Sequence, residues 1–439
     1  MSEKGKNREG VIYSKSTRSN FGKTGWLFII VGIIVNFVGA GSLNDGLNVI
    51  VPQFAEMYGW DSATMLAIAT PATIIGMVAT FFVSMYIVKK GYRYMLAITL
   101  IGTGVMLMIE GRITQLWQYI LVYILLNLFI NASIYACMHP AITNYFPTKK
   151  GLVVGWISMG ANFSSAGYCI ILLAIAGVIG FRRSFDFYAI IMFVMGVVCF
   201  FLIRDNPEDI GYFPDNDQTM TMEEVERLNE LGKEYEKTSP FTIKKLLQTK
   251  QVWQIGIGMG GILLITVGIM SQIVPRLESI GYTEDQALNM MVVAALIGLL
   301  GSFAWGKLDV KIGTKKTVLI FIVWTIVTLA VNLIPNTVAS WIGLIMIGSF
   351  IGGGNNLSTS VTGTVFGRYD FKRAWAVILP INTFVRAFGF MVVGSLASFM
   401  GGDFTVSFIL CIVVAFVSLI LIWTLDDKCI GRIDLIGEK

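Results

Sequence analysis

The sequence predicts an all-α membrane protein with twelve transmembrane helices in two six-helix bundles and both termini in the cytoplasm. Three observations support this fold: long apolar stretches, a one-sided distribution of Lys and Arg, and an internal repeat. Of the 439 residues, 14% are charged and 55% are hydrophobic. A soluble domain usually carries about 25% charged residues, so soluble-enzyme, disordered and disulfide-scaffold classes are excluded.

The apolar stretches define the expected spans. No Lys or Arg occurs between Lys23 and Lys89, and no charge of either sign occurs between Lys316 and Arg368. Because a transmembrane helix needs about 20 mostly apolar residues, each of these intervals holds two spans. Membrane strands would alternate apolar and polar residues, and these runs do not. The expected spans are 26–52, 62–87, 94–110, 117–144, 151–178, 185–203, 252–274, 286–306, 317–334, 339–362, 374–399 and 405–425.

The basic residues predict the orientation. Of 33 Lys and Arg residues, 28 fall on segments that are cytoplasmic if both termini are inside, and four fall on outer segments. This is the positive-inside distribution. The net charge of +5 is therefore a topology signal, and no nucleic-acid partner is expected. The predicted organisation is an N-terminal tail, 1–25; a bundle, 26–203; a central loop, 204–250; a second bundle, 251–425; and a C-terminal tail, 426–439.

The two bundles are related by an internal repeat. Ile50–Gln53 recurs as Ile273–Arg276, and Val88–Arg93 recurs as Val310–Lys315, each at an offset of about 222 residues. With six spans in each half, both halves run in the same direction through the membrane. Such parallel repeats place a substrate site near the midplane, between the halves.

The loops after the second and eighth spans carry a further pattern. Ser84–Arg93 and Gly306–Lys316 resemble the G-x-x-x-D-R-x-G-R-R loop of the major facilitator superfamily, with the Gly and the basic residues retained. The acidic position is Val in both copies, and Asp309 lies one residue early in the second. The resemblance covers essentially the whole chain. It implies a secondary transporter.

Four shorter loop motifs narrow this resemblance. They are similar to the monocarboxylate and oxalate/formate antiporter branch of the superfamily, and they are Gly59–Ala63, Tyr145–Gly151, Asn206–Gly211 and Phe366–Phe371. The branch resemblance implies a small organic anion as substrate and a basic residue of span 11 facing it. The oxalate-carrier pattern also implies an Arg in span 8, and Ala287–Trp305 contains no charge.

Arg386 is the one basic residue inside an expected span. It lies about 13 residues after Arg373, or ~19 Å into the bilayer. An Arg at mid-membrane costs about 2.5–3.5 kcal/mol to insert, so it must face a cavity or a partner. Its repeat equivalent is Phe163, so the fold itself does not require a cation here. We expect Arg386 to bind an anionic substrate through its planar guanidinium; a helix-packing role is the alternative.

Polar residues on three spans are expected to complete the binding site. In span 4, Asn131, Tyr135 and His139 recur every four residues and form one slowly rotating stripe. Asn382 shares a helix face with Arg386, and Asn355 follows three consecutive glycines in span 10. Polar contacts that only hold helices together remain an alternative for each of these residues.

Three residues are candidates for proton coupling. His139 titrates near neutral pH in its ordinary state, although a packing role is equally open. Asp45 is expected near the outer end of span 1, and Glu110 ends span 3, so solvation of either carboxylate is also open.

The sequence therefore predicts a multi-pass protein of the cell membrane that moves a monocarboxylate-like anion by alternating access. The driver is proton symport or anion exchange. No enzyme motif, cofactor or metal site is expected, and the protein is expected to be monomeric and surrounded by lipid. A permease for a neutral solute or drug and a non-transporting receptor or scaffold are the rival interpretations.

Overall fold

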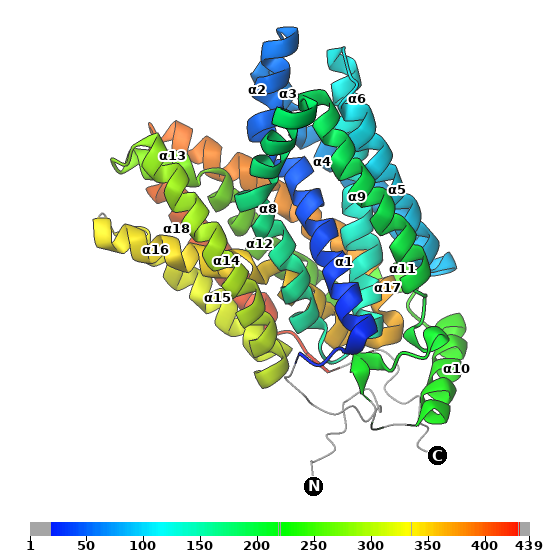
Figure 1. The fold of residues 1–439 in the computed structure, drawn as a ribbon. Coiled ribbons are helices and arrows are strands. Elements are labelled where there is room, and N and C mark those ends of the chain that lie inside the picture. Colours follow the sequence, from blue (N-terminus) through cyan, green and yellow to red (C-terminus); the bar gives the residue numbers. More distant parts are fainter. Residues whose placement is uncertain (1–18, 218, 220, 335, 429, 431–439) are drawn as a thin grey trace. The chain divides into compact units, whose positions relative to one another are not determined.

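The computed structural model describes residues 19–217, 219, 221–334, 336–428 and 430 (Figure 1). Within these residues the secondary structure is helical and contains no strand, which confirms the predicted all-α class. Residues 1–18 of the predicted N-terminal tail, and residues 429 and 431–439 of the predicted C-terminal tail, lie outside the described residues.

By contacts, the chain divides into two compact units. The N-terminal unit consists of Phe21–Ala141 and Ile157–Ile210. In it, α5 packs along α9, and α4 packs along α6. Its elements are α1 (Gly22–Ala40), the π-helix η1 (Gly41–Asp45), α2 (Leu47–Tyr58), α3 (Ser62–Ala67), α4 (Ala69–Lys90), α5 (Arg93–Glu110), α6 (Leu116–Asn131), the π-helix η2 (Ala132–Met138), the start of α7 (His139–Tyr145), most of α8 (Lys150–Ile179), α9 (Phe181–Leu202) and η3 (Pro207–Ile210).

The C-terminal unit contains Ile142–Trp156 together with the described residues from Gly211 onward. The turn between α7 and α8, which belongs to the first sequence half, is thus part of this unit. Its other elements are η4 (Pro214–Asn216), α10 (Met222–Thr238), α11 (Ile243–Leu247), α12 (Lys250–Ser271), α13 (Ile273–Ser279), α14 (Glu284–Ile312), α15 (Thr314–Val331), α16 (Thr337–Ile351), α17 (Gly353–Phe399) and α18 (Thr405–Trp423).

The apolar helices are long enough to cross a membrane. Ten stretches of the described chain qualify, or eleven if the bent pair within α8 is one span. One stretch, Thr337–Ala397, has 61 residues, about three times the length that a single span needs. It contains both predicted spans 339–362 and 374–399, and Gly367, with φ of 71°, breaks the helix between them. The chain is a multi-pass membrane protein.

Span 1 is longer than predicted and contains an irregular turn. Helical structure runs from Gly22 to Tyr58, and the amide of Gly46 donates to the carbonyl of Gly41 over 2.7 Å, an i→i+5 bond of the π type. A Cβ at Gly41 would lie 1.9 Å from the ring of Tyr168. Glycine therefore lets the irregular turn pack directly against α8.

Glycines also bring α12 and α17 together. A Cβ at Gly389 of α17 would lie 2.4 Å from the carbonyl oxygen of Leu264, and one at Gly260 of α12 would lie 3.3 Å from the Cα of Asn382. Small residues at a helix contact in a membrane let the two backbones approach closely. This contact fixes the half of α17 that carries Arg386.

Candidate functional site

Asp45 lies in the middle of the N-terminal unit and is held by two hydroxyl groups. Ser164 Oγ donates to Oδ2 over 2.6 Å, and Ser165 Oγ donates to Oδ1 over 3.1 Å. Ser164 is 14 residues after the start of α8, or ~21 Å along that helix. Asp45 is therefore level with the middle of α8, deeper than the position that the sequence predicted for it. Its side chain is only partly buried.

The polar stripe of span 4 runs through the second π-helix. Tyr135 lies inside η2, and its ring meets the ring of His139 edge-on with centroids 5.4 Å apart. Residues four apart advance slightly more than one turn in an α-helix and slightly less in the wider π-helix. The π-helical segment η2 therefore counteracts the slow rotation of the polar stripe that the four-residue spacing predicted. Asn131 Nδ2 donates to the carbonyl of Asn127 over 2.7 Å, so this amide is satisfied within its own helix.

Glu110 is enclosed rather than solvated. Its side chain is 1% exposed, and among the described residues it has no hydrogen-bond or ion-pair partner. The hydroxyl of Tyr119, in the adjoining α6, is likewise buried and unpartnered. His139 is also buried, with 5% of its surface exposed. Asp45 is the most accessible of the three proton-coupling candidates.

Arg386 stands on α17 without a protein counter-ion. Its side chain is partly buried, and the described residues supply no hydrogen bond, ion pair or ring contact to its guanidinium. In this respect it differs from Arg112, which pairs with Asp186 at 2.6 Å, and from Arg276, which donates to the carbonyl of Asn332 over 2.8 Å. The positive charge of Arg386, which is costly to place in a membrane, is therefore available to bind an anionic ligand.

Asn382 and Asn355 lie on the two limbs of α17, in the same unit as Arg386. Asn382 Nδ2 donates to Ser358 Oγ over 2.8 Å and joins the two limbs of α17 across the break. Its Oδ1 is buried and has no hydrogen-bond partner in the described part of the chain. Asn355 lies three residues before Ser358, and Arg386 lies four residues after Asn382. Because the two limbs of α17 run in opposite directions, Asn355 and Arg386 both lie about one helical turn from the Asn382–Ser358 hydrogen bond, on the same side of it.

Asp309, which stands one residue before the acidic position of the family loop, contacts the start of α8. Asp309 is 4% exposed and accepts a hydrogen bond of 2.5 Å from Ser360 Oγ. A Cβ at Gly151, at the start of α8, would lie 1.9 Å from Asp309 Oδ2. Asp309 thus reaches a helix N-terminus, where a negative charge is favourable, although it stands one residue before the family position. This contact, which compensates for the displaced position of Asp309, is visible only in the three-dimensional structure.

The predicted site residues fall into two sets. The N-terminal unit holds Asp45, Glu110 and the whole span 4 stripe, and the C-terminal unit holds Asn355, Asn382 and Arg386. Sequence reasoning missed the hydroxyl clamp on Asp45, because Ser164 and Ser165 lie about 120 residues away. The sequence feature that could have indicated this contact was the pair of adjacent serines, Ser164 and Ser165, in the middle of span 5.

Residues 29–308 match the family described as the Major Facilitator Superfamily, which is more than half of the chain. Among curated proteins, the membrane sensor protein UhpC of Salmonella typhimurium is 29% identical over 156 residues, covering 33% of this chain and 35% of that protein. The multidrug resistance protein MdtG of Salmonella paratyphi C is 23% identical over 242 residues, covering 55% of each. The chain thus matches between about a third and about half of the length of these relatives.

Two solved structures share the fold over nearly the whole chain. The proton:xylose symporter XylE bound to 6-bromo-6-deoxy-D-glucose superposes with a TM-score of 0.71 at 13% identity, covering 93% of this chain and 98% of that one. The Escherichia coli fucose:proton symporter FucP superposes with a TM-score of 0.66 at 13% identity, covering 91% and 98%. At this identity the likeness concerns the fold alone.

Proposed function

Because the chain belongs to the major facilitator superfamily, we propose that it is a secondary transporter that carries a small organic anion, with a single carboxylate, across the cell membrane. Transporters built from parallel repeats work by alternating access, in which the two halves rock around a central site. Family membership supports a carrier in general. Beyond this general role, we propose that the substrate is an anion and that its transport is coupled to proton symport or to anion exchange.

The observation that carries the proposal is the uncompensated guanidinium of Arg386. A charged group in a span is normally paired, and this one has no partner among the described residues. A planar guanidinium binds a carboxylate through two parallel hydrogen bonds. The substrate carboxylate would therefore take the place of the missing counter-ion.

Neighbouring residues support a monocarboxylate over a dicarboxylate. Asn355 and Asn382 offer uncharged hydrogen-bonding groups near Arg386. Span 8 carries no cation between Ala287 and Trp305 to hold a second carboxylate. The loop motifs that resemble the monocarboxylate and oxalate/formate branch point the same way, and Tyr135 and Asn131 would hydrogen-bond the substrate from the other bundle.

Asp45 is the proton site in this proposal. Its carboxylate accepts hydrogen bonds from two serines and keeps partial solvent exposure, so a proton can reach it. Glu110 and His139 are more enclosed. Proton symport would then proceed with Asp45 loading a proton in one bundle while Arg386 holds the anion in the other. Anion exchange needs Arg386 and no protonation of Asp45.

Two other functions have specific observations behind them. The span 4 stripe is largely uncharged, which suits a neutral solute, and the two fold neighbours are a xylose symporter and a fucose symporter. A membrane sensor is the second alternative, since one relative carries that name. A neutral-solute carrier would transport without regard to substrate charge, and a sensor would bind its ligand without transporting it.

The test uses purified protein in liposomes with imposed proton gradients. Labelled acetate, lactate, formate and oxalate are compared with the neutral amides acetamide and lactamide, and protein-free liposomes give the background. We expect gradient-driven accumulation of at least one monocarboxylate above background, little oxalate, and no amide. Equal transport of acid and amide would support a neutral permease, and binding without uptake would support a sensor; either result contradicts the proposal.

A further inference from the structure

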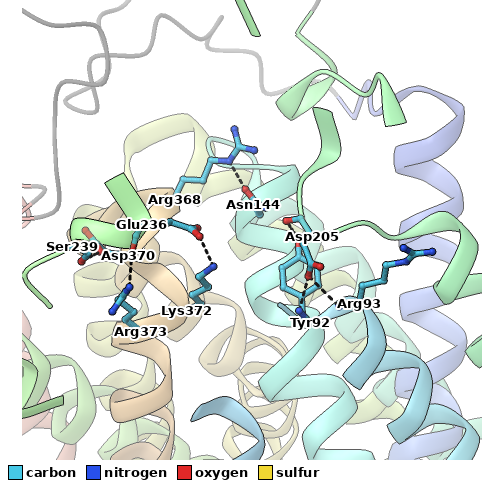
Figure 2. A network of polar contacts seen from close by, with 10 residues as sticks. All are labelled: Tyr92, Arg93, Asn144, Asp205, Glu236, Ser239, Arg368, Asp370, Lys372 and Arg373. Carbon is cyan, nitrogen blue, oxygen red and sulfur yellow. Dashed lines mark hydrogen bonds and ion pairs between the residues drawn. The ribbon is translucent and has the colours of Figure 1, made fainter. Parts of the chain in front are cut away.

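The central loop contacts two turns that the internal repeat makes equivalent. Lys149–Lys150 stand at the start of α8, and Lys372–Arg373 stand after the break in α17, at matching positions in the two repeats. Within the C-terminal unit, the start of the loop contacts the first of these turns, and its helix α10 contacts the second. Figure 2 shows the α10 contacts. We call α10 (Met222–Thr238), which the chain connects to the first contact, the strap.

The first anchor of the strap is Asp215. Its Oδ2 accepts hydrogen bonds from the amide and hydroxyl of Thr148, at 2.9 and 2.8 Å, and its Oδ1 accepts one from the amide of Lys149 at 3.0 Å. These bonds cap the start of α8. Burial raises the pKa of Asp215, and the bonds from Thr148 and the charge of Lys149 oppose that rise. Enclosed on all sides, this anchor is firmly held.

The second anchor is the apolar face of α10. Gly232 packs on the ring of Tyr369, where a Cβ would lie 2.1 Å from a ring carbon. Tyr235 Oη and Ser239 Oγ each donate a hydrogen bond of 2.5 Å to the carboxylate of Asp370. Figure 2 shows Ser239 beside Asp370. Amphipathic spacing explains this docking, since Val225, Leu228, Asn229, Gly232 and Tyr235 fall on one buried face.

The rim of this anchor is open to water. Lys372 Nζ and Glu236 Oε2 are 2.7 Å apart, with 20% and 28% of their side chains exposed. Arg373 donates a hydrogen bond of 2.5 Å to the backbone carbonyl of Glu236. Ion pairs that keep access to water contribute little to stability. Because Asp215 is fully buried, the rim of α10 is the more accessible of the two anchors.

The same turn of α17 also binds the α7–α8 turn directly. Arg368 Nε donates to Asn144 Oδ1, as Figure 2 shows. Gly363 lies against α7, where a Cβ would be 3.2 Å from the methyl group of Thr143. The two equivalent turns are thus linked twice, once through side chains and once through the strap. A motion that separates them breaks the direct contact, and release of α10 from residues 368–373 would free the second link.

We propose that α10 is a releasable strap on the cytoplasmic side: docked on residues 368–373, it holds the two equivalent turns together, and its release lets that side open. This inference rests on the alternating-access cycle of the proposed function. It gives the charged helix of the central loop a mechanical role beyond that of a linker.

The experiment measures opening without any substrate. In a full-length background lacking the native cysteines, Thr143→Cys reports whether the contact between α7 and α17 opens. Labelling by an impermeant maleimide is timed in inside-out vesicles, and hydrogen exchange of residues 222–238 reports docking of α10. Glu236→Lys places like charges beside Lys372, the swap Glu236→Lys with Lys372→Glu restores the pair, and Glu230→Lys on the exposed face is the matched control.

We expect Glu236→Lys to speed both exchange in α10 and labelling at position 143, the latter about tenfold. The swapped pair should return both rates to within about twofold of the parent, and Glu230→Lys should change neither. Gly232→Leu, which collides with Tyr369, should act like Glu236→Lys. Released α10 with unchanged labelling would overturn the proposal, and so would failure of both variants to release α10. Neither readout depends on the transported anion, so the strap and the anion site are tested separately.

Discussion

Asp45 and Arg386 are both charged residues inside helical spans, and the protein treats them in opposite ways. The carboxylate of Asp45 is held by Ser164 and Ser165, whereas the described residues leave the guanidinium of Arg386 without a partner. A clamped carboxylate needs no ligand to compensate its charge, and a proton can neutralise it without occupying space. An open guanidinium must be neutralised from outside, so it suits an anion. On this comparison we propose that coupling belongs to the N-terminal unit and substrate binding to the C-terminal unit.

The largest expected effect comes from removing the charge of Asp45. Asp45→Asn keeps the shape but cannot take up and release a proton, so gradient-driven accumulation should fall to the protein-free background. Anion exchange across equal pH should continue, because Arg386 is untouched. Both rates are measured in liposomes with the same preparation. Retained accumulation would show that the proton is carried elsewhere and would remove Asp45 from the comparison.

The second effect concerns the scaffold under Arg386. Gly389→Leu would push a side chain into the carbonyl oxygen of Leu264, 2.4 Å from an ideal Cβ, and overpacking of this kind typically costs about 1–3 kcal/mol or more. We expect a large loss of monodisperse protein by size-exclusion chromatography. Gly177→Leu is the control, because a Cβ there meets nothing within 4 Å. Equal yields would mean that the close α12–α17 contact does not hold Arg386 in place.

A smaller effect is expected when the clamp on Asp45 is loosened. Ser164→Ala removes the shorter of the two hydroxyl bonds, 2.6 Å against 3.1 Å for Ser165. A hydrogen bond to a charged group is worth about 1.5–3 kcal/mol, so the ionised carboxylate becomes less favourable and the pH of half-maximal uptake should rise by about one unit. Ser165→Ala should shift it less. Identical profiles for both variants and the parent would show that the serines only join helices.

The smallest effect is expected at His139. It is 5% exposed and packs edge-on against Tyr135, so the structure gives it a contact rather than a path for protons. His139→Gln should leave the pH profile of uptake within about 0.2 units of the parent. Uptake rates across pH 5–8 provide the measurement. A clear shift would make His139 a second proton site and weaken the contrast between the two units.

The sequence predicted the parts of this account that depend on composition and spacing. The helical class and Arg386 were visible because charges are rare in long apolar runs. The depth of Asp45 was not, because the π-turn at Gly41–Asp45 and the extension of span 1 to Tyr58 leave no periodic signal. The burial of Glu110 depends on neighbours that spacing does not specify.

The cytoplasmic contacts were equally hidden from the sequence. Asp215 caps a helix that begins 65 residues before it, and Asp370 binds hydroxyls more than 130 residues away. The charge pattern of α10 gives no indication of its docking site. Long-range pairs of this kind require the fold to be known first.

The most direct test of the central claim is the affinity of folded Arg386→Gln for a monocarboxylate and for its neutral amide. Loss of a charge-assisted pair predicts about 10–100-fold weaker binding of the anion, with the amide changed little. Arg386→Lys should fall between Gln and the parent, because it keeps the charge without the planar fork. If the anion loses no more affinity than the amide, Arg386 does not bind the substrate charge and the account is contradicted.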